Sequence, residues 1–140
     1  MTRFVGMSFL ALAMACSSST GTRNLSFQGR STVAPAPPMT VETVVTVRNV
    51  GDKTTQIGTN TCGQPLRAYS TPDRTGTWVW QSYDPAAVNC AAVATFATLA
   101  PGDYYDFHFD GTIPSTLPSG VYYLAVNIAG RQVPAGQFSK

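Results

Sequence analysis

Short runs of β-branched and aromatic residues, separated by turns rich in glycine and proline, constrain the fold of this chain more than any other feature. Residues 40–50 (TVETVVTVRNV) are β-branched almost throughout, which is typical of a long strand. Residues 104–110 place Tyr105, Phe107 and Phe109 on one face and mostly polar side chains on the other, as in a strand buried on one side. Six further strands are expected at residues 54–59, 64–70, 77–82, 93–99, 121–128 and 131–138.

No amphipathic helix pattern separates these runs. The sequence therefore predicts an all-β fold, a single antiparallel β-sandwich of about seven to eight strands. Trp78 and Trp80 are two positions apart, so both are expected to point to the same face and to anchor the core. Pro134 cannot donate a ladder hydrogen bond, which predicts that residues 131–138 form an edge strand.

The N-terminal residues 1–16 read MTRFVGMSFLALAMAC, with one arginine, an apolar run and a small residue directly before Cys16. This arrangement resembles a bacterial lipoprotein signal. The resemblance implies that residues 1–15 are a removed signal peptide and that Cys16 carries the lipid that holds the chain at a membrane. An ordinary secretory signal, cut after the A-x-A sequence of residues 13–15, is the alternative. The apolar run is shorter than the ~20 residues that a membrane-spanning helix needs.

Residues 16–38 read CSSSTGTRNLSFQGRSTVAPAPP, which is rich in Ser, Thr, Gly and Pro and almost without apolar periodicity. Such a composition predicts a flexible tether, stiffened over residues 35–38 by proline. The β-sandwich domain is then expected to occupy residues 39–140, which is a normal length for one domain.

If Cys16 is lipidated, two cysteines remain, Cys62 and Cys90, and two cysteines suit one disulfide in an extracytoplasmic protein. Metal ligation is the alternative role for them. His108 is the only histidine and the chain has no C-x-x-C pair, so a zinc site lacks ligands and no metal is expected.

The charge balance argues against a nucleic-acid partner. The chain has nine basic and seven acidic residues with no basic cluster, whereas nucleic-acid binding depends on clustered Lys and Arg. The sequence also has no glycine-rich phosphate loop, no G-x-S-x-G and no H-E-x-x-H. We therefore expect a protein without catalytic residues and without a cofactor.

Candidate contacts for a ligand or partner come from two strands. Asp106, His108 and Asp110 share the strand face opposite the apolar one, where they would form either a small cation site, a pH-sensitive patch or simply a solvated surface. Tyr104 and Tyr122 have the parity opposite to the expected core residues, which suggests exposed aromatic rings. The candidate contact residues are therefore Tyr104, Tyr122, Asp106 and His108.

Three turn motifs, at residues 47–53 (VRNVGDK), 99–103 (LAPGD) and 118–122 (PSGVY), accompany the tryptophan strand. Together they resemble the immunoglobulin-like domains of bacterial surface proteins, and among these the intracellular proteinase inhibitor (BsuPI) family. The resemblance covers residues 41–128 and implies an immunoglobulin-like β-sandwich. The chain departs from that family in its signal and its cysteine pair, and no reactive-site residue of the family can be carried over.

Two functions follow as expectations. The first is a membrane-anchored binding or structural module without catalytic activity in the bacterial cell envelope, at the outer membrane if the cell is Gram-negative. Such a module would contact an envelope protein through loops or an exposed edge strand. The alternative is a protease inhibitor of the cell envelope that presents residues 71–76 or 83–90 to the enzyme as a rigid loop.

Overall fold

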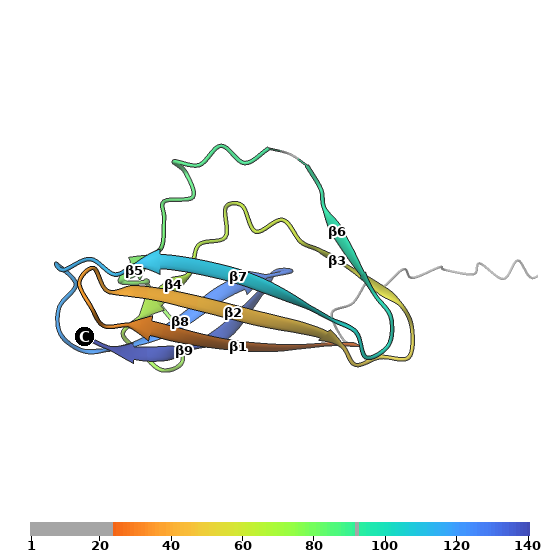
Figure 1. The fold of residues 1–140 in the computed structure, drawn as a ribbon, viewed down its shortest axis with the longest axis horizontal. Helices are drawn as coiled ribbons and strands as arrows, with labels where there is room; N and C mark the ends of the chain where they lie inside the picture. The colour runs from red at the N-terminus through yellow and green to blue at the C-terminus, as the bar shows by residue number, and fades with distance from the viewer. Residues whose placement is uncertain (1–23, 92) are drawn as a thin grey trace, which may run out of the picture.

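The computed structural model describes residues 24–91 and 93–140, and these contain nine β-strands (Figure 1). The strands are β1 (Leu25–Ala34), β2 (Thr40–Asn49), β3 (Thr55–Gly58), β4 (Arg67–Tyr69), β5 (Trp80–Gln81), β6 (Phe96–Leu99), β7 (Tyr104–Thr112), β8 (Val121–Ile128) and β9 (Arg131–Ser139). None of the described residues forms a helix that is long and apolar enough to cross a membrane.

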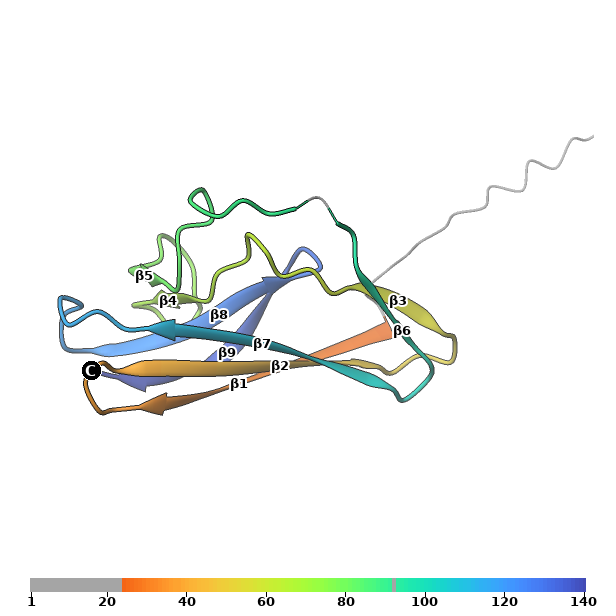
Figure 2. The same cartoon turned by 45° about the horizontal axis from the view of Figure 1, so that its top comes forward.

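Two antiparallel sheets pack face to face (Figure 1, Figure 2). The first sheet has the strand order β1-β2-β7, and the second has the order β5-β4-β8-β9. β3 and β6 pair only with each other and form a two-stranded ribbon at one end of the sandwich. The predicted all-β antiparallel sandwich is confirmed. β9 is an outer strand of its sheet, as Pro134 predicted.

The flexible tether predicted for residues 16–38 is wrong over Leu25–Ala34, because these ten residues form β1. β1 pairs with β2 along its whole length, from Leu25 opposite Asn49 to Ala34 opposite Thr40. Its small residues permit a close approach to β9: a Cβ on Gly29 would lie 2.3 Å from the Pro134 carbonyl oxygen. The sandwich therefore includes residues that we assigned to the tether. Cys16 and the predicted signal lie outside the described residues.

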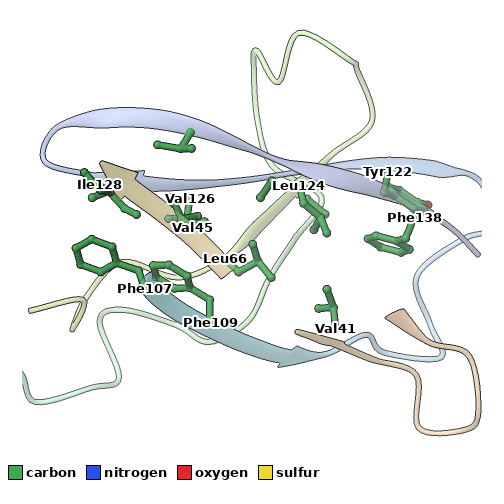
Figure 3. Close-up of a cluster of buried hydrophobic side chains, with 14 of the residues drawn as sticks. Val41, Val45, Leu66, Phe107, Phe109, Tyr122, Leu124, Val126, Ile128 and Phe138 are labelled. Atoms are coloured by element: carbon green, nitrogen blue, oxygen red, sulfur yellow. The ribbon is translucent and has the colours of Figure 1, made fainter. Parts of the chain in front are cut away.

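The core lies between the two sheets and is lined by alternate residues of each long strand (Figure 3). Phe107 and Phe109 face inward as predicted, while Tyr105 is half-buried beside them. Leu66 and Leu124 are fully buried. The other large contributions come from β2, β8 and β9, namely Val41, Val45, Val47, Tyr122, Val126, Ile128, Val133 and Phe138.

The expectation that both tryptophans anchor the core is wrong for one of them. Trp80 is 8% exposed, whereas Trp78 is 40% exposed. The strand predicted at residues 77–82 is only two residues long, so the period-two alternation does not extend back to Trp78. Trp78 packs instead against Arg67 on β4.

Candidate functional site

Two connecting segments form an arch beside the first sheet. The arch consists of residues 59–66, which join β3 to β4, and residues 82–91, which follow β5. Both segments run above β7 in Figure 1. The Cys62–Cys90 disulfide joins them, with 5.6 Å between the two Cα atoms, and this confirms the predicted pairing. The Tyr83 hydroxyl also donates a hydrogen bond to the Thr61 carbonyl oxygen at 3.3 Å.

β7 has one open edge, because it is the outer strand of the first sheet. The Ile113 amide donates to the Met39 carbonyl oxygen at 2.9 Å, and this pair belongs to the same register as β2 and β7. In an antiparallel pair, hydrogen-bonded and non-hydrogen-bonded positions alternate. The odd-numbered residues of β7 therefore bond to β2. The even-numbered residues, including His108, Asp110 and Thr112, direct their backbone N–H and C=O groups to the open edge.

A cleft of about 470 Å³ lies along this edge. Residues 108–112 of β7 form one wall, and Thr61, Ser82 and Tyr83 of the arch contribute to the other. Ser82 is held in place on both sides, since its amide donates to the Leu66 carbonyl oxygen and its hydroxyl accepts from the Leu66 amide. The cleft is therefore bordered by open strand edge on one side and by cross-linked chain on the other.

The inner side of the cleft is supported by Trp80. A Cβ placed on Gly111 would lie 2.7 Å from Cη2 of Trp80 and 2.9 Å from Cβ of Ser82. Only glycine lets the indole pack this closely beneath β7. The tryptophan thus packs directly beneath the part of β7 that borders the cleft.

The outer face of β7 carries acidic side chains. His108 and Asp110 are exposed, and Glu42 of β2 lies directly opposite Asp110 in the register. Asp106 is half-buried and accepts a hydrogen bond from the Thr46 hydroxyl at 2.6 Å. No lysine or arginine is among the residues that line the cleft. Within residues 24–91 and 93–140, no three His, Cys, Asp or Glu side chains gather closely enough to hold a metal ion.

The structure separates the four residues that we predicted as contacts. His108 lines the cleft, and Asp106 lies two residues away on the same face of β7. Tyr104 is 57% exposed at the far end of that strand, where the Arg48 guanidinium lies 5.3 Å from its ring centroid.

The expectation that Tyr122 is exposed is wrong. It is only 6% exposed, and its hydroxyl donates to the Pro118 carbonyl oxygen at 2.7 Å. The run VYYLAVNI is apolar on both faces, so its composition does not decide which face of β8 turns inward.

The arch was not predicted from the sequence as a wall of the site. Thr61 and Ser82 carry no motif, and Tyr83 begins the second candidate inhibitor loop. The predicted Cys62–Cys90 bridge was the sequence feature that could have indicated the arch, because a disulfide requires the two segments around it to meet.

Residues 71–76, the first candidate inhibitor loop, are held by the Arg74 side chain. Its Nε donates to the Leu124 carbonyl oxygen at 2.8 Å, beside a bulge in β8, and Nη2 donates to the Gly136 carbonyl oxygen at 3.2 Å. Hydrogen bonds from the Thr71 hydroxyl and from Thr75 lower the pKa of Asp73 below its ordinary value. These contacts give the loop one defined conformation.

The comparisons with known proteins add little. No protein-family model matches this sequence, and no curated protein is significantly similar to it. The similar solved structures include β-glucosidase 3B from Thermotoga neapolitana in complex with glucose, at 12% sequence identity and a TM-score of 0.44. That match covers 81% of this chain and 16% of the glucosidase chain. A resemblance at this level carries no functional conclusion for the present chain.

Proposed function

We propose that this chain is a non-enzymatic, lipid-anchored binding module of the bacterial cell envelope, and that it binds an extended segment of a partner protein along the open edge of β7. One observation carries the proposal: His108, Asp110 and Thr112 direct backbone N–H and C=O groups into a cleft beside the strand. Such an edge recruits an extended segment as an additional strand, because main-chain hydrogen bonds supply affinity.

The dimensions of the site suit a short strand. From Asp106 to Thr112 the edge extends roughly 20 Å, at about 3.3 Å per residue, which accommodates about six residues of a partner. The arch restricts access to this edge, and its disulfide limits how far its wall can move. A wall that is already in place reduces the ordering entropy that binding costs.

The proposed location depends on two features. The Cys62–Cys90 disulfide is compatible with an oxidising compartment outside the cytoplasm. The lipid anchor depends on Cys16, so metabolic labelling with a fatty-acid probe should label the wild type and not Cys16→Ser. A wild-type protein that stays unlabelled and begins with a free amine at Cys16 would point to an ordinary secretory signal.

The backbone of β7 can be tested separately from its side chains. His108→Pro removes the outward N–H without touching the ladder to β2, whereas His108→Ala removes the side chain and keeps the N–H. In a screen of ten-residue peptides, we expect a binding peptide to slow amide exchange at Asp110 and Thr112. We expect His108→Pro to weaken that binding at least about tenfold, because it removes one well-formed hydrogen bond at a buried site. His108→Ala should weaken the binding less.

The same screen can reject the proposal. Peptides that bind without slowing exchange at these amides, or that bind His108→Pro as tightly as the wild type, would place binding elsewhere on the sandwich. Unfolding midpoints of both variants should remain within a few degrees of the wild type, which separates loss of binding from loss of fold.

A second candidate is protease inhibition through residues 71–76, and it is favoured by the hydrogen bonds of Arg74 to Leu124 and Gly136. A loop held in one conformation resists cleavage in a protease active site because little ordering entropy is lost on binding. A panel of serine, cysteine and metalloproteases distinguishes the two proposals. Stoichiometric inhibition that weakens in Arg74→Ala favours the inhibitor, and no inhibition at micromolar protein favours the binding module.

A further inference from the structure

The chemistry of the partner segment can be derived from the outer face of β7. Asp106, His108 and Asp110 follow one another at every second residue on that face. A strand added at the open edge would place its own outward side chains beside these three, with Cβ atoms about 4.5–5.5 Å apart at directly opposed positions. The charges on this face therefore decide which segment fits.

Negative charge gathers at this side of the sheet. Asp106 and Asp110 lie on the edge strand, and Glu42 lies one strand inward, directly opposite Asp110. Two basic side chains share this face. Arg30 belongs to β1 and lies opposite Val44. Arg48 belongs to β2, lies opposite Tyr104, and donates a hydrogen bond to the Gly102 carbonyl oxygen. Two strand spacings, about 9.6 Å, separate β1 from β7. An added strand thus meets carboxylates before it meets a cation.

A second copy of this chain does not fit that charge pattern. Suppose that two β7 strands paired antiparallel with His108 opposite His108. Asp106 of each copy would then lie opposite Asp110 of the other. Like charges directly opposite one another destabilise a strand pair. This register is therefore unfavourable for a second copy, whereas a basic partner complements the two carboxylates.

We infer that the segment bound at β7 is an extended, basic peptide with Lys or Arg at two positions four residues apart, one beside Asp106 and one beside Asp110. The residue midway between them lies beside His108 and is uncharged. This inference rests on the proposed function, since it names the chemistry of the segment that the open edge binds. Opposite charges on neighbouring strands stabilise the pair, whichever direction the added strand runs.

Three matched peptides test the charge requirement. The first is Thr-Lys-Thr-Val-Thr-Lys-Thr with blocked ends; the others carry Gln or Glu in place of both lysines. By calorimetry at low salt, we expect the Lys peptide to bind at least about fivefold more tightly than the Gln peptide, and the Glu peptide to bind weakest. The advantage of the Lys peptide should shrink at 0.5 M salt, because screening weakens exposed charge pairs.

Charge reversal provides the control within the protein. Asp110→Lys should remove the preference for the Lys peptide and favour the Glu peptide. Asp52→Lys makes the same change in net charge in the turn after β2, outside the cleft, and should leave the preference unchanged. Equal effects of both substitutions would show that only net charge matters, and this would overturn the inference.

The outcomes separate this inference from the proposed function. If all three peptides bind alike and His108→Pro weakens each of them, the edge is used but its partner is not selected by charge, and the inference fails. If the Lys peptide binds His108→Pro and wild type equally, edge binding itself fails. If none of the three peptides binds, the inference of a basic partner also fails. It fails as well if sedimentation shows a wild-type dimer that His108→Pro abolishes.

Discussion

The guanidinium carbon of Arg67 lies 4.0 Å from the centroid of the Trp78 ring. Within the described residues, Nε of Arg67 is buried and has no hydrogen-bond partner. The stacked indole therefore covers a polar group that would otherwise be reached by water. Because Trp78 itself remains 40% exposed, its role is to cover the Arg67 side chain and not to fill the core.

The two tryptophans should contribute very differently to stability. We expect Trp78→Ala to lower the free energy of unfolding by about 1 kcal/mol or less, the size of an exposed cation–π contact. Trp80→Ala should cost about 3–5 kcal/mol, because it opens a cavity beneath β7. Urea denaturation of both variants measures the difference, and comparable losses would contradict the packing described above.

Gly29 and Gly58 form a matched pair of strand glycines. Gly29→Ala places a Cβ 2.3 Å from the Pro134 carbonyl oxygen and 2.8 Å from the Ala135 Cα, and neither backbone atom can move freely. We expect a loss of about 1–3 kcal/mol from this overpacking. Gly58→Ala meets no atom within 4 Å and should be neutral or stabilise by up to about 1 kcal/mol. Thermal unfolding of both variants tests whether β1 closes against β9; a harmless Gly29→Ala would argue against it.

The Cys62–Cys90 bridge should stabilise the arch against unfolding. It spans a sequence separation of 28 residues. Closing a loop of this length is worth about 2–4 kcal/mol on the chain-entropy account, and we expect the Cys62→Ser/Cys90→Ser variant to lose about that amount. In the native protein both thiols should resist alkylation until a reductant is added. Alkylation of the folded protein without reductant would show that the bridge is absent.

The loop around Asp73 should respond to acid. Because hydrogen bonds from Thr71 and Thr75 lower the pKa of Asp73 below its ordinary value of 3.8, the ionised carboxylate stabilises the folded loop above that pH. The contribution is lost as the pH falls through the lowered pKa. Thr75→Val should shift the Asp73 titration midpoint upward in a carboxyl NMR titration, while Thr77→Val should not. An unchanged midpoint in Thr75→Val would exclude the hydroxyl as a cause.

Much of the strand content follows from local composition. Residues 40–50 and 104–110 were predicted as long strands, because β-branched and alternating apolar residues favour one extended, half-buried backbone. β2 and β7 appear there with nearly the predicted bounds. The disulfide followed from counting cysteines, and the edge position of β9 followed from Pro134.

Local composition did not decide β1 or the inward face of β8. β1 contains small and polar residues that resemble a linker, and its burial depends on pairing with β2 and on packing against β9, which lies far away in the sequence. β8 is apolar on both faces, so only packing against the first sheet turned Tyr122 inward and left Tyr123 half-buried.

His108 was recognised from the sequence as a candidate contact, but the site around it was not. The alternating pattern of residues 104–110 determined which side chains of β7 face solvent, since that depends only on the backbone pleat. Which edge of β7 stays open, and which loop borders it, depends on the order of strands in the sheet. Strand order is set by contacts between residues distant in the chain, and those contacts depend on shape and burial in the assembled sandwich rather than on any local preference.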